Sequence, residues 1–163
     1  MASGDTLVIL TPLGAELPAS NYGSMGARNA HPHLAFDTTT QEIAFWSFAL
    51  PANYAGNGLS VTLHWMTASG ITTGTVGWDL SIERMSDGAT ALDSDNFATA
   101  QTVTAATVPG TSGVVKKTTG SVPAANMNSA VAGDSVRLRV RRDVANDNAA
   151  GDAQLILIEV KEA

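Results

Sequence analysis

Apolar and polar residues alternate most clearly in residues 59–84. Side chains of a β-strand point to opposite faces at every second residue, so this pattern predicts two strands joined by the Gly/Thr-rich turn at residues 68–75. Asp79, Ser81 and Glu83 are expected on the polar outer face of the second strand. The residues expected to face the core are Val61, Leu63, Trp65, Trp78, Leu80 and Ile82.

The same alternation recurs along the rest of the chain, with turn signals at short and fairly regular intervals. It predicts about eight or nine antiparallel strands in a sandwich or barrel rather than an alternation of strands and helices. The further strands are expected at residues 6–11, 33–36, 41–50, 99–108, 113–119, 135–142 and 154–161. We therefore expect an all-β, single-domain, jelly-roll-like β-sandwich. Residues 1–32 would form an N-terminal strand and an extended arm or loop, and residues 33–163 the sandwich itself.

Residues 12–32 interrupt the alternation and contain several Pro, Gly and Asn residues. A connection of this length without secondary structure is unusual in a compact domain and usually has a function. One interpretation, which we prefer, is an arm that lies along a neighbouring subunit. The other is a loop packed over one end of its own sandwich.

Composition narrows the classes of partner. The chain is 44% hydrophobic and only 15% charged, with a formal net charge of −6 and no cysteine. A low share of charged residues favours lasting contact with neighbouring proteins. The negative net charge disfavours binding to nucleic acid or to an anionic membrane. The first residues lack the basic and apolar regions of a signal peptide, so we expect synthesis in the cytoplasm.

Two features could bind a metal ion. The His31-Pro-His33 spacing could supply two imidazole ligands, but without a fixed third ligand a polar loop and strand start is the better interpretation. Residues 143–152 are rich in Asp and Asn, whose side chains also serve turns by bonding to their own backbone. We expect no metal and no cofactor, and residues 143–152 are the place where an ion would bind if one does.

Four arginines cluster near the end of the chain and supply nearly half of its nine basic residues. One interpretation is a basic stripe that binds carboxylates of a partner through forked hydrogen bonds. The other is an outer strand face whose arginines pair with Asp79 and Glu83 on a neighbouring strand. The pattern leaves both open. The arginine row consists of Arg137, Arg139 and Arg141, with Arg142 next to it.

Catalytic motifs are missing from the sequence. No nucleophile elbow, phosphate-binding loop, dinucleotide fingerprint or closely spaced carboxylate pair is found. The three tryptophans, Trp46, Trp65 and Trp78, fall at positions expected to face the core, so packing is a better interpretation than a sugar-stacking platform. We therefore expect a protein that is not an enzyme.

Several short segments of the sequence resemble segments in a family of small virion proteins of tailed bacteriophages. They are ASGDTL (2–7), PASNY (18–22), RNAHP (28–32), FDTTT (36–40), LPANYAG (50–56), LSVTLHWM (59–66), GWD (77–79), ER (83–84), DNFA (95–98), AGD (132–134) and RLRVRRD (137–143). This resemblance implies a jelly-roll-like structural protein similar to head decoration, or cement, proteins.

The resemblance further implies a partner and a location. The partners would be the major capsid protein and further copies of the same chain in a homotrimer, on the capsid surface of the virion, with no role for nucleic acid or membrane. The alternative is a carbohydrate- or receptor-binding module of a tail or head fibre, because sandwiches of this kind bind many ligands. The candidate residues for contact with subunits or capsid are Leu13, Leu17, Tyr22, Met25, Arg28, Arg137, Arg139, Arg141, Ile156 and Ile158.

Overall fold

The computed structural model describes residues 2–163, in which ten strands and three short 3-10 helices are found. The strands are β1 (Thr6–Leu10), β2 (Ser24–Arg28), β3 (His31–Phe36), β4 (Ile43–Ala49), β5 (Gly58–Thr67), β6 (Thr75–Met85), β7 (Gln101–Thr107), β8 (Lys116–Pro123), β9 (Ser135–Arg142) and β10 (Ala153–Glu162). The 3-10 helices are η1 (Pro12–Gly14), η2 (Ala124–Asn126) and η3 (Val144–Asn146). None of these helices has the length and apolar character needed to span a bilayer.

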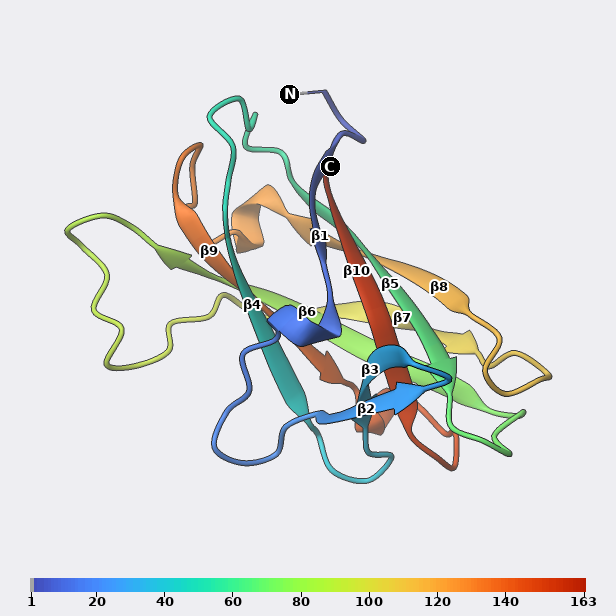
Figure 1. Ribbon diagram of the computed structural model, residues 1–163. Helices are drawn as coiled ribbons and strands as arrows, with labels where there is room; N and C mark the ends of the chain where they lie inside the picture. Colours follow the sequence, from blue (N-terminus) through green and yellow to red (C-terminus); the bar gives the residue numbers. More distant parts are fainter. Residues whose placement is uncertain (1) are drawn as a thin grey trace.

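Two antiparallel sheets pack face to face and confirm the predicted β-sandwich (Figure 1). The first sheet has the order β2-β3-β10-β5-β8, and β1 also pairs with β10. The second sheet has the order β4-β9-β6-β7. One edge of β10 pairs with β5, while its other edge is shared by β3 at residues 153–155 and by β1 at residues 158–161. The final strand therefore lies at the centre of the first sheet.

The predicted core-facing residues of β5 and β6 are all buried between the sheets. The Trp78 ring lies edge-on to Phe36, with 5.2 Å between ring centroids, and edge-on to Trp65, with 6.4 Å between centroids. The indole nitrogen of Trp65 donates to the Thr118 hydroxyl at 2.9 Å, and that of Trp46 donates to the Thr11 carbonyl at 2.8 Å. Large aromatic side chains contribute much of the apolar area of such a core, so the tryptophans serve packing.

The outer face of β6 differs from the prediction of a solvated polar face. Asp79, Ser81 and Glu83 do point away from the core, yet each is at most 5% exposed. The side chains of the arginine row lie over this face, and Phe97, from the loop after β6, pairs with Glu83 in an isolated β-bridge. Alternation gives the face of a side chain correctly, but only the fold shows what covers that face.

Residues 12–32 lie against their own sandwich, which is the second of the two interpretations for this segment. Glu16 and Tyr22 form isolated bridges with Phe45 and Ile43 on the free edge of β4. Residues 24–28 form β2, a strand that the sequence did not predict, and β3 begins at His31 instead of residue 33. Residues 2–163 therefore form ten strands instead of eight or nine.

Candidate ligand-binding groove

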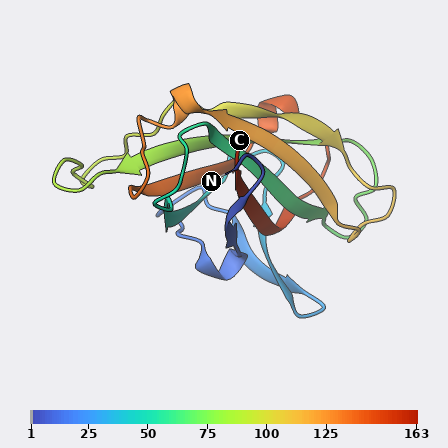
Figure 2. The same ribbon diagram turned by 90° about the horizontal axis from the view of Figure 1, so that it is seen from above.

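A groove with a volume of about 540 Å³ opens on the outer face of the first sheet. Its floor comes from β5 and from the start of β10. The β2–β3 hairpin, which projects from the sandwich in Figure 2, forms one wall, and the loop before β8 forms the other. We call it the hairpin groove, and its lining residues are Arg28, Asn29, His31, Pro32, His64, Met66, Gly113, Val115, Ile156 and Leu157.

The hairpin wall depends on a tight turn and on one close contact. Asn29 and Ala30 have φ angles of 47° and 62°, the left-handed conformation at both central positions of a two-residue turn. Such turns match the right-handed twist of the paired strands. Within the hairpin, Gly26 of β2 pairs with His33 of β3 and lies under its ring, where an added Cβ would be 2.7 Å from Nε2. The glycine therefore allows the ring to pack onto the backbone of β2.

An irregularity in β10 shapes the floor. The pairing between β10 and β5 shifts between Leu155 and Leu157, so Ile156 has no partner on β5. Because of the extra residue, Leu155 and Ile158 both point into the core, and Ile158 is only 1% exposed. Ile156 and Leu157 instead line the groove. Of the two isoleucines predicted as contact residues, one therefore lies in the groove and the other in the protein's own core.

Arg28 crosses from the hairpin to the opposite wall. Its Nη1 donates a hydrogen bond to the Thr67 carbonyl at 2.9 Å. The guanidinium lies against Gly113, where an added Cβ would be 2.7 Å from Cζ. Within residues 2–163, no carboxylate lies close enough to form an ion pair with it. Arg28 is thus a fixed cation without a counter-ion on the wall of the groove.

His64 projects from β5 into the groove. Its Nε2 atom is buried and has no hydrogen-bond partner within the described residues. Burial lowers the pKa of His64 below 6.5, and the nearby Lys117 ammonium lowers it further, against a smaller opposite effect of Glu159. The ring is therefore neutral at pH 7, and one of its nitrogens can donate or accept a hydrogen bond from a ligand.

The arginine row does not lie in the groove; it covers the outer face of the second sheet. Arg141 Nε lies 2.6 Å from Asp79 Oδ1, and Arg137 Nε lies 2.9 Å from Glu16 Oε2. Arg137 is also 3.9 Å from Glu83 and 3.3 Å from Asp95. The guanidinium groups of Arg137 and Arg139 lie over aromatic rings, those of Phe45 and Phe97. The cross-strand pairs of one sequence interpretation are thus present.

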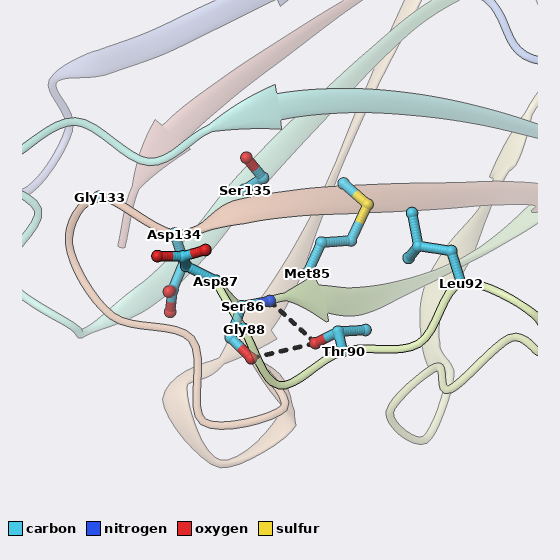
Figure 3. Close-up of a pocket in the computed structure, with 9 residues that line it drawn as sticks. All are labelled: Met85, Ser86, Asp87, Gly88, Thr90, Leu92, Gly133, Asp134 and Ser135. Atoms are coloured by element: carbon cyan, nitrogen blue, oxygen red, sulfur yellow. Dashed lines mark hydrogen bonds between the residues drawn. The ribbon is translucent and has the colours of Figure 1, made fainter.

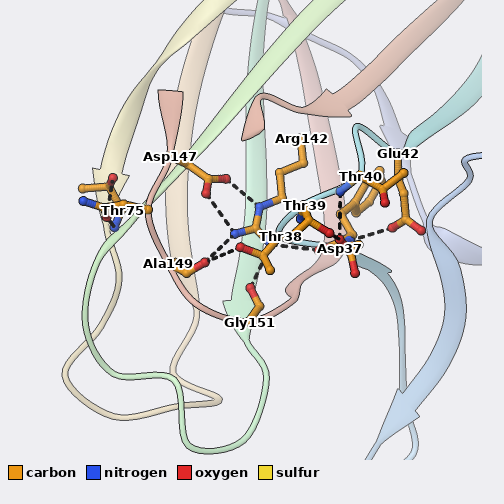
Figure 4. Close-up of polar contacts among 12 residues, drawn as sticks. Asp37, Thr38, Thr39, Thr40, Glu42, Thr75, Arg142, Asp147, Ala149 and Gly151 are labelled. Atoms are coloured by element: carbon orange, nitrogen blue, oxygen red, sulfur yellow. Dashed lines mark hydrogen bonds and ion pairs between the residues drawn. The ribbon is translucent and has the colours of Figure 1, made fainter. Parts of the chain in front are cut away.

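Residues 143–152, where an ion would bind if one does, surround the guanidinium of Arg142 (Figure 4). Arg142 is fully buried, with Nε 2.6 Å from Asp147 Oδ2. It also donates to the backbone carbonyls of Phe36, Ala149 and Gly151 at 2.8–3.0 Å. Within residues 2–163, no three His, Asp or Glu side chains are grouped so that they could hold a metal ion.

A second cavity, of about 500 Å³, lies at the end of β6, where the loops at residues 86–92 and 133–135 meet (Figure 3). Its carboxylate Asp134 is already bonded. It accepts a hydrogen bond from the Val131 backbone at 2.8 Å, and Arg84 Nε lies 2.7 Å away. The Val131 N–H, more than Arg84, lowers the pKa of Asp134. Asp134 is therefore a structural anion and not an acid that donates a proton to a substrate.

The remaining predicted contact residues, Leu13, Leu17, Tyr22 and Met25, are all exposed, with Leu13 at 73%. Ile9 is exposed as well. We call these five residues the N-terminal apolar set. They come from β1, η1, the following loop and β2.

Sequence reasoning placed Arg28 and Ile156 among the contact residues but missed the rest of the groove lining. His31 was considered only as part of a two-histidine metal motif, and His64 was not considered as a site residue. A signal was present at Asn29-Ala30, since Asn readily adopts positive φ and is common in two-residue hairpin turns. The close approach of Gly113 to Arg28 has no local signal, because these residues are far apart in the sequence.

Comparison with known proteins leaves the family open. No protein-family model matches the chain, and no curated protein matches it. Among solved structures, the fold is similar to the carbohydrate-binding module CBM27-1 of Caldicellulosiruptor saccharolyticus, solved with mannohexaose, at TM-score 0.41 and 10% identity over 93% of this chain and 91% of that one. It is also similar to the K1 cleaved adhesin domain of Lys-gingipain from Porphyromonas gingivalis W83, at TM-score 0.39 and 14% identity over 96% and 90% of the two chains. Similarity at this level concerns the general β-sandwich layout alone.

Proposed function

We propose that this protein is a non-catalytic binding module that holds an oligosaccharide in the hairpin groove. The observation that carries the proposal is a concave site on a rigid sheet whose polar groups are not all used by the protein itself. Its volume of about 540 Å³ falls within the typical range of ligand pockets, roughly 300–1,000 Å³. The polar group left available is the guanidinium of Arg28, of which a single N–H donates within the protein.

The lining suits a hydroxyl-rich ligand. Asn29, His31 and His64 can each donate and accept hydrogen bonds, as sugar hydroxyls do. Ile156 and Leu157 form an apolar floor for the C–H faces of a sugar ring. The tryptophans lie in the core and not in the groove, so binding would use hydrogen bonds and aliphatic contacts instead of indole stacking.

The same lining disfavours hydrolysis of a bound sugar. Most glycosidases use two carboxyl groups on either side of the bond that is cleaved. None of the ten residues that line the hairpin groove is Asp or Glu. A ligand held there would meet no general acid or nucleophile from the groove itself.

A variant that fills the groove tests this proposal. Val115 lines the groove and is half exposed, so Val115→Trp should block the site without disturbing the core. Val131 is similarly exposed but does not line the groove, which makes Val131→Trp a matched control. We expect the wild type and the control to bind the same oligosaccharides on a glycan array, and Val115→Trp to lose them. Equal binding by all three proteins, or no glycan binding at all, would contradict the proposal.

A second candidate function is decoration of a phage head as a homotrimer, bound to the major capsid protein on the virion surface. The exposed N-terminal apolar set favours it, since a group of large apolar side chains in one segment suits contact with another protein. Sedimentation equilibrium and co-sedimentation with empty phage heads test it. A Leu13→Ser/Leu17→Ser variant should then lose trimer formation or head binding, and a wild type that stays monomeric and binds no heads would rule it out.

A further inference from the structure

We infer that the hairpin groove takes an oligosaccharide that carries a carboxylate, as a uronic acid does, and that Arg28 binds this carboxylate. This inference rests on the proposed function and names the class of ligand. Three observations carry it: the missing counter-ion of Arg28, the way in which its guanidinium is held, and the charges that surround the groove.

Arg28 is exceptional among the six arginines of this acidic chain. Four arginines form ion pairs: Arg84 with Asp134, Arg137 with Glu16, Arg141 with Asp79 and Arg142 with Asp147. The fifth, Arg139, has its guanidinium 4.6 Å from the Phe97 ring centroid. Arg28 has neither a carboxylate nor an aromatic ring within the described residues, although acidic residues outnumber basic ones by 15 to 9.

The guanidinium of Arg28 is nevertheless held in place. One of its five N–H groups donates to the Thr67 carbonyl, and the absence of a side chain at Gly113 lets it lie against the loop. A cation that is fixed before binding loses little conformational entropy when it binds an anion. Its planar shape also matches a carboxylate, to which it can donate two parallel hydrogen bonds. The groove therefore offers a positioned site for a carboxylate.

The surroundings add positive charge and hydrogen-bond donors. His31 and His64 line the groove, Lys117 lies near His64, and no acidic side chain contributes to the lining. Glu159 raises the pKa of His64, and its Oε1 accepts from Thr6 at 3.1 Å and lies 3.3 Å from Lys161. Asp152 raises the pKa of His33, and Arg28 lowers it. An anionic ligand would thus meet little repulsion.

The test compares ligands that differ only in charge. The folded protein is screened on an array of neutral and uronic-acid oligosaccharides, with each acidic glycan also present as its methyl ester. We expect binding to at least one acidic oligosaccharide and a loss of about tenfold or more on esterification, as for a hydrogen bond to a charged group. Binding to the acid should also weaken with added NaCl, since salt screens the attraction.

Variants then assign the effect to Arg28. Arg28→Gln should reduce affinity for the acid to that for its ester, and Arg28→Lys should give an intermediate affinity because it keeps the charge and loses the fork. Arg139→Gln, which changes another arginine without an ion pair, should bind like the wild type. If Arg28→Gln fails to fold, the comparison of acid and ester binding by the wild type still decides whether the protein recognises the carboxylate.

The outcomes separate the two proposals. Binding of neutral and esterified glycans as strong as binding of acids would overturn the carboxylate inference and leave the proposed function standing. If the protein binds neither acidic nor neutral oligosaccharides, both the carboxylate inference and the proposed function are overturned.

Discussion

The arginines of β9 and Arg28 of β2 lie in two regions that treat a positive charge in opposite ways. On the second sheet, Glu16, Asp79 and Asp95 surround the arginine row, and two aromatic rings lie under its guanidinium groups. On the first sheet, Arg28 lies on the wall of an open groove, and residues 2–163 provide no carboxylate partner for it. A charge whose partners are all internal serves stability, while a charge that is held but unpaired is available to a ligand.

The difference between the covered outer face of the second sheet and the open groove on the first comes mainly from the loops. The segment at residues 93–98 and the segment around Glu16 lie over the outer face of the second sheet. They supply Asp95, Phe97 and Glu16, in addition to the carboxylates that β6 itself carries. The hairpin and the loop before β8 instead rise on either side of the first sheet and leave its centre uncovered. Both outer faces come from strands with alternating residues, so connections between strands decide which face is closed.

The largest expected effect is loss of the most buried ion pair. Arg142→Ala should lower the free energy of unfolding by about 3–5 kcal/mol, because it leaves Asp147 charged and buried and three carbonyls without their donor. Arg28→Ala removes one hydrogen bond to a carbonyl and should cost about 1 kcal/mol or less. Urea unfolding at pH 7 measures both. Equal losses of unfolding free energy in the two variants would contradict the distinction between an arginine that stabilises the fold and one that is available to a ligand.

A smaller effect is expected within the arginine row itself. The Asp79 side chain is 7% exposed and that of Glu16 is 42% exposed, although each lies within 3 Å of an arginine. Asp79→Asn should lower the unfolding free energy by about 1.5–3 kcal/mol, and Glu16→Gln by less than about 1 kcal/mol, since water screens the exposed pair. If chemical denaturation shows a larger loss for Glu16→Gln than for Asp79→Asn, the loops over this sheet shield Asp79 from water less than the geometry indicates.

The smallest effect concerns pH and only the first sheet. Burial lowers the pKa of His33 and His64 from 6.5, so the unfolded chain binds protons more readily than the folded one. Their contribution to stability is present in full above pH 6.5 and is lost as the pH falls from 6.5 through the lowered pKa values of the folded state. Unfolding free energies measured from pH 7.5 to 5.5 should therefore decrease.

A His33→Gln/His64→Gln variant should decrease less over the same range. Asp37 and Asp134 do not interfere, since hydrogen bonds lower their pKa values from 3.8 and their contribution disappears only at still more acidic pH. A double variant with the same pH slope as the wild type would exclude the two histidines as the cause.

Alternation was sufficient to predict the sandwich because burial of one face repeats every second residue along each strand. It gave β9 as residues 135–142, the bounds that the structure has. It missed β2, whose sequence Ser-Met-Gly-Ala-Arg has no β-branched residue and lies at a sheet edge, where little burial enforces a pattern. The pattern also did not predict the extra residue in β10. It therefore did not predict that Ile156 and Ile158 lie in different places.

The groove was less predictable than the sheets because it depends on contacts between distant segments. Arg28, His64 and Gly113 come together only after the first sheet has formed and its loops have folded back. Composition could show a shortage of basic residues, but pairing in space was needed to show which arginine has neither a carboxylate nor an aromatic ring as a partner within residues 2–163.

The pairing of β1 with β10 brings Gly4 next to Glu162, because Gly4 N–H donates to the Glu162 carbonyl at 2.9 Å (Figure 1). The hairpin groove lies at the other end of β10, near residues 156–157. A tether fused to either terminus would leave from the same corner and would not cover the groove. Several copies immobilised in this way on one particle would face a surface together, and individually weak contacts would add up to firm attachment.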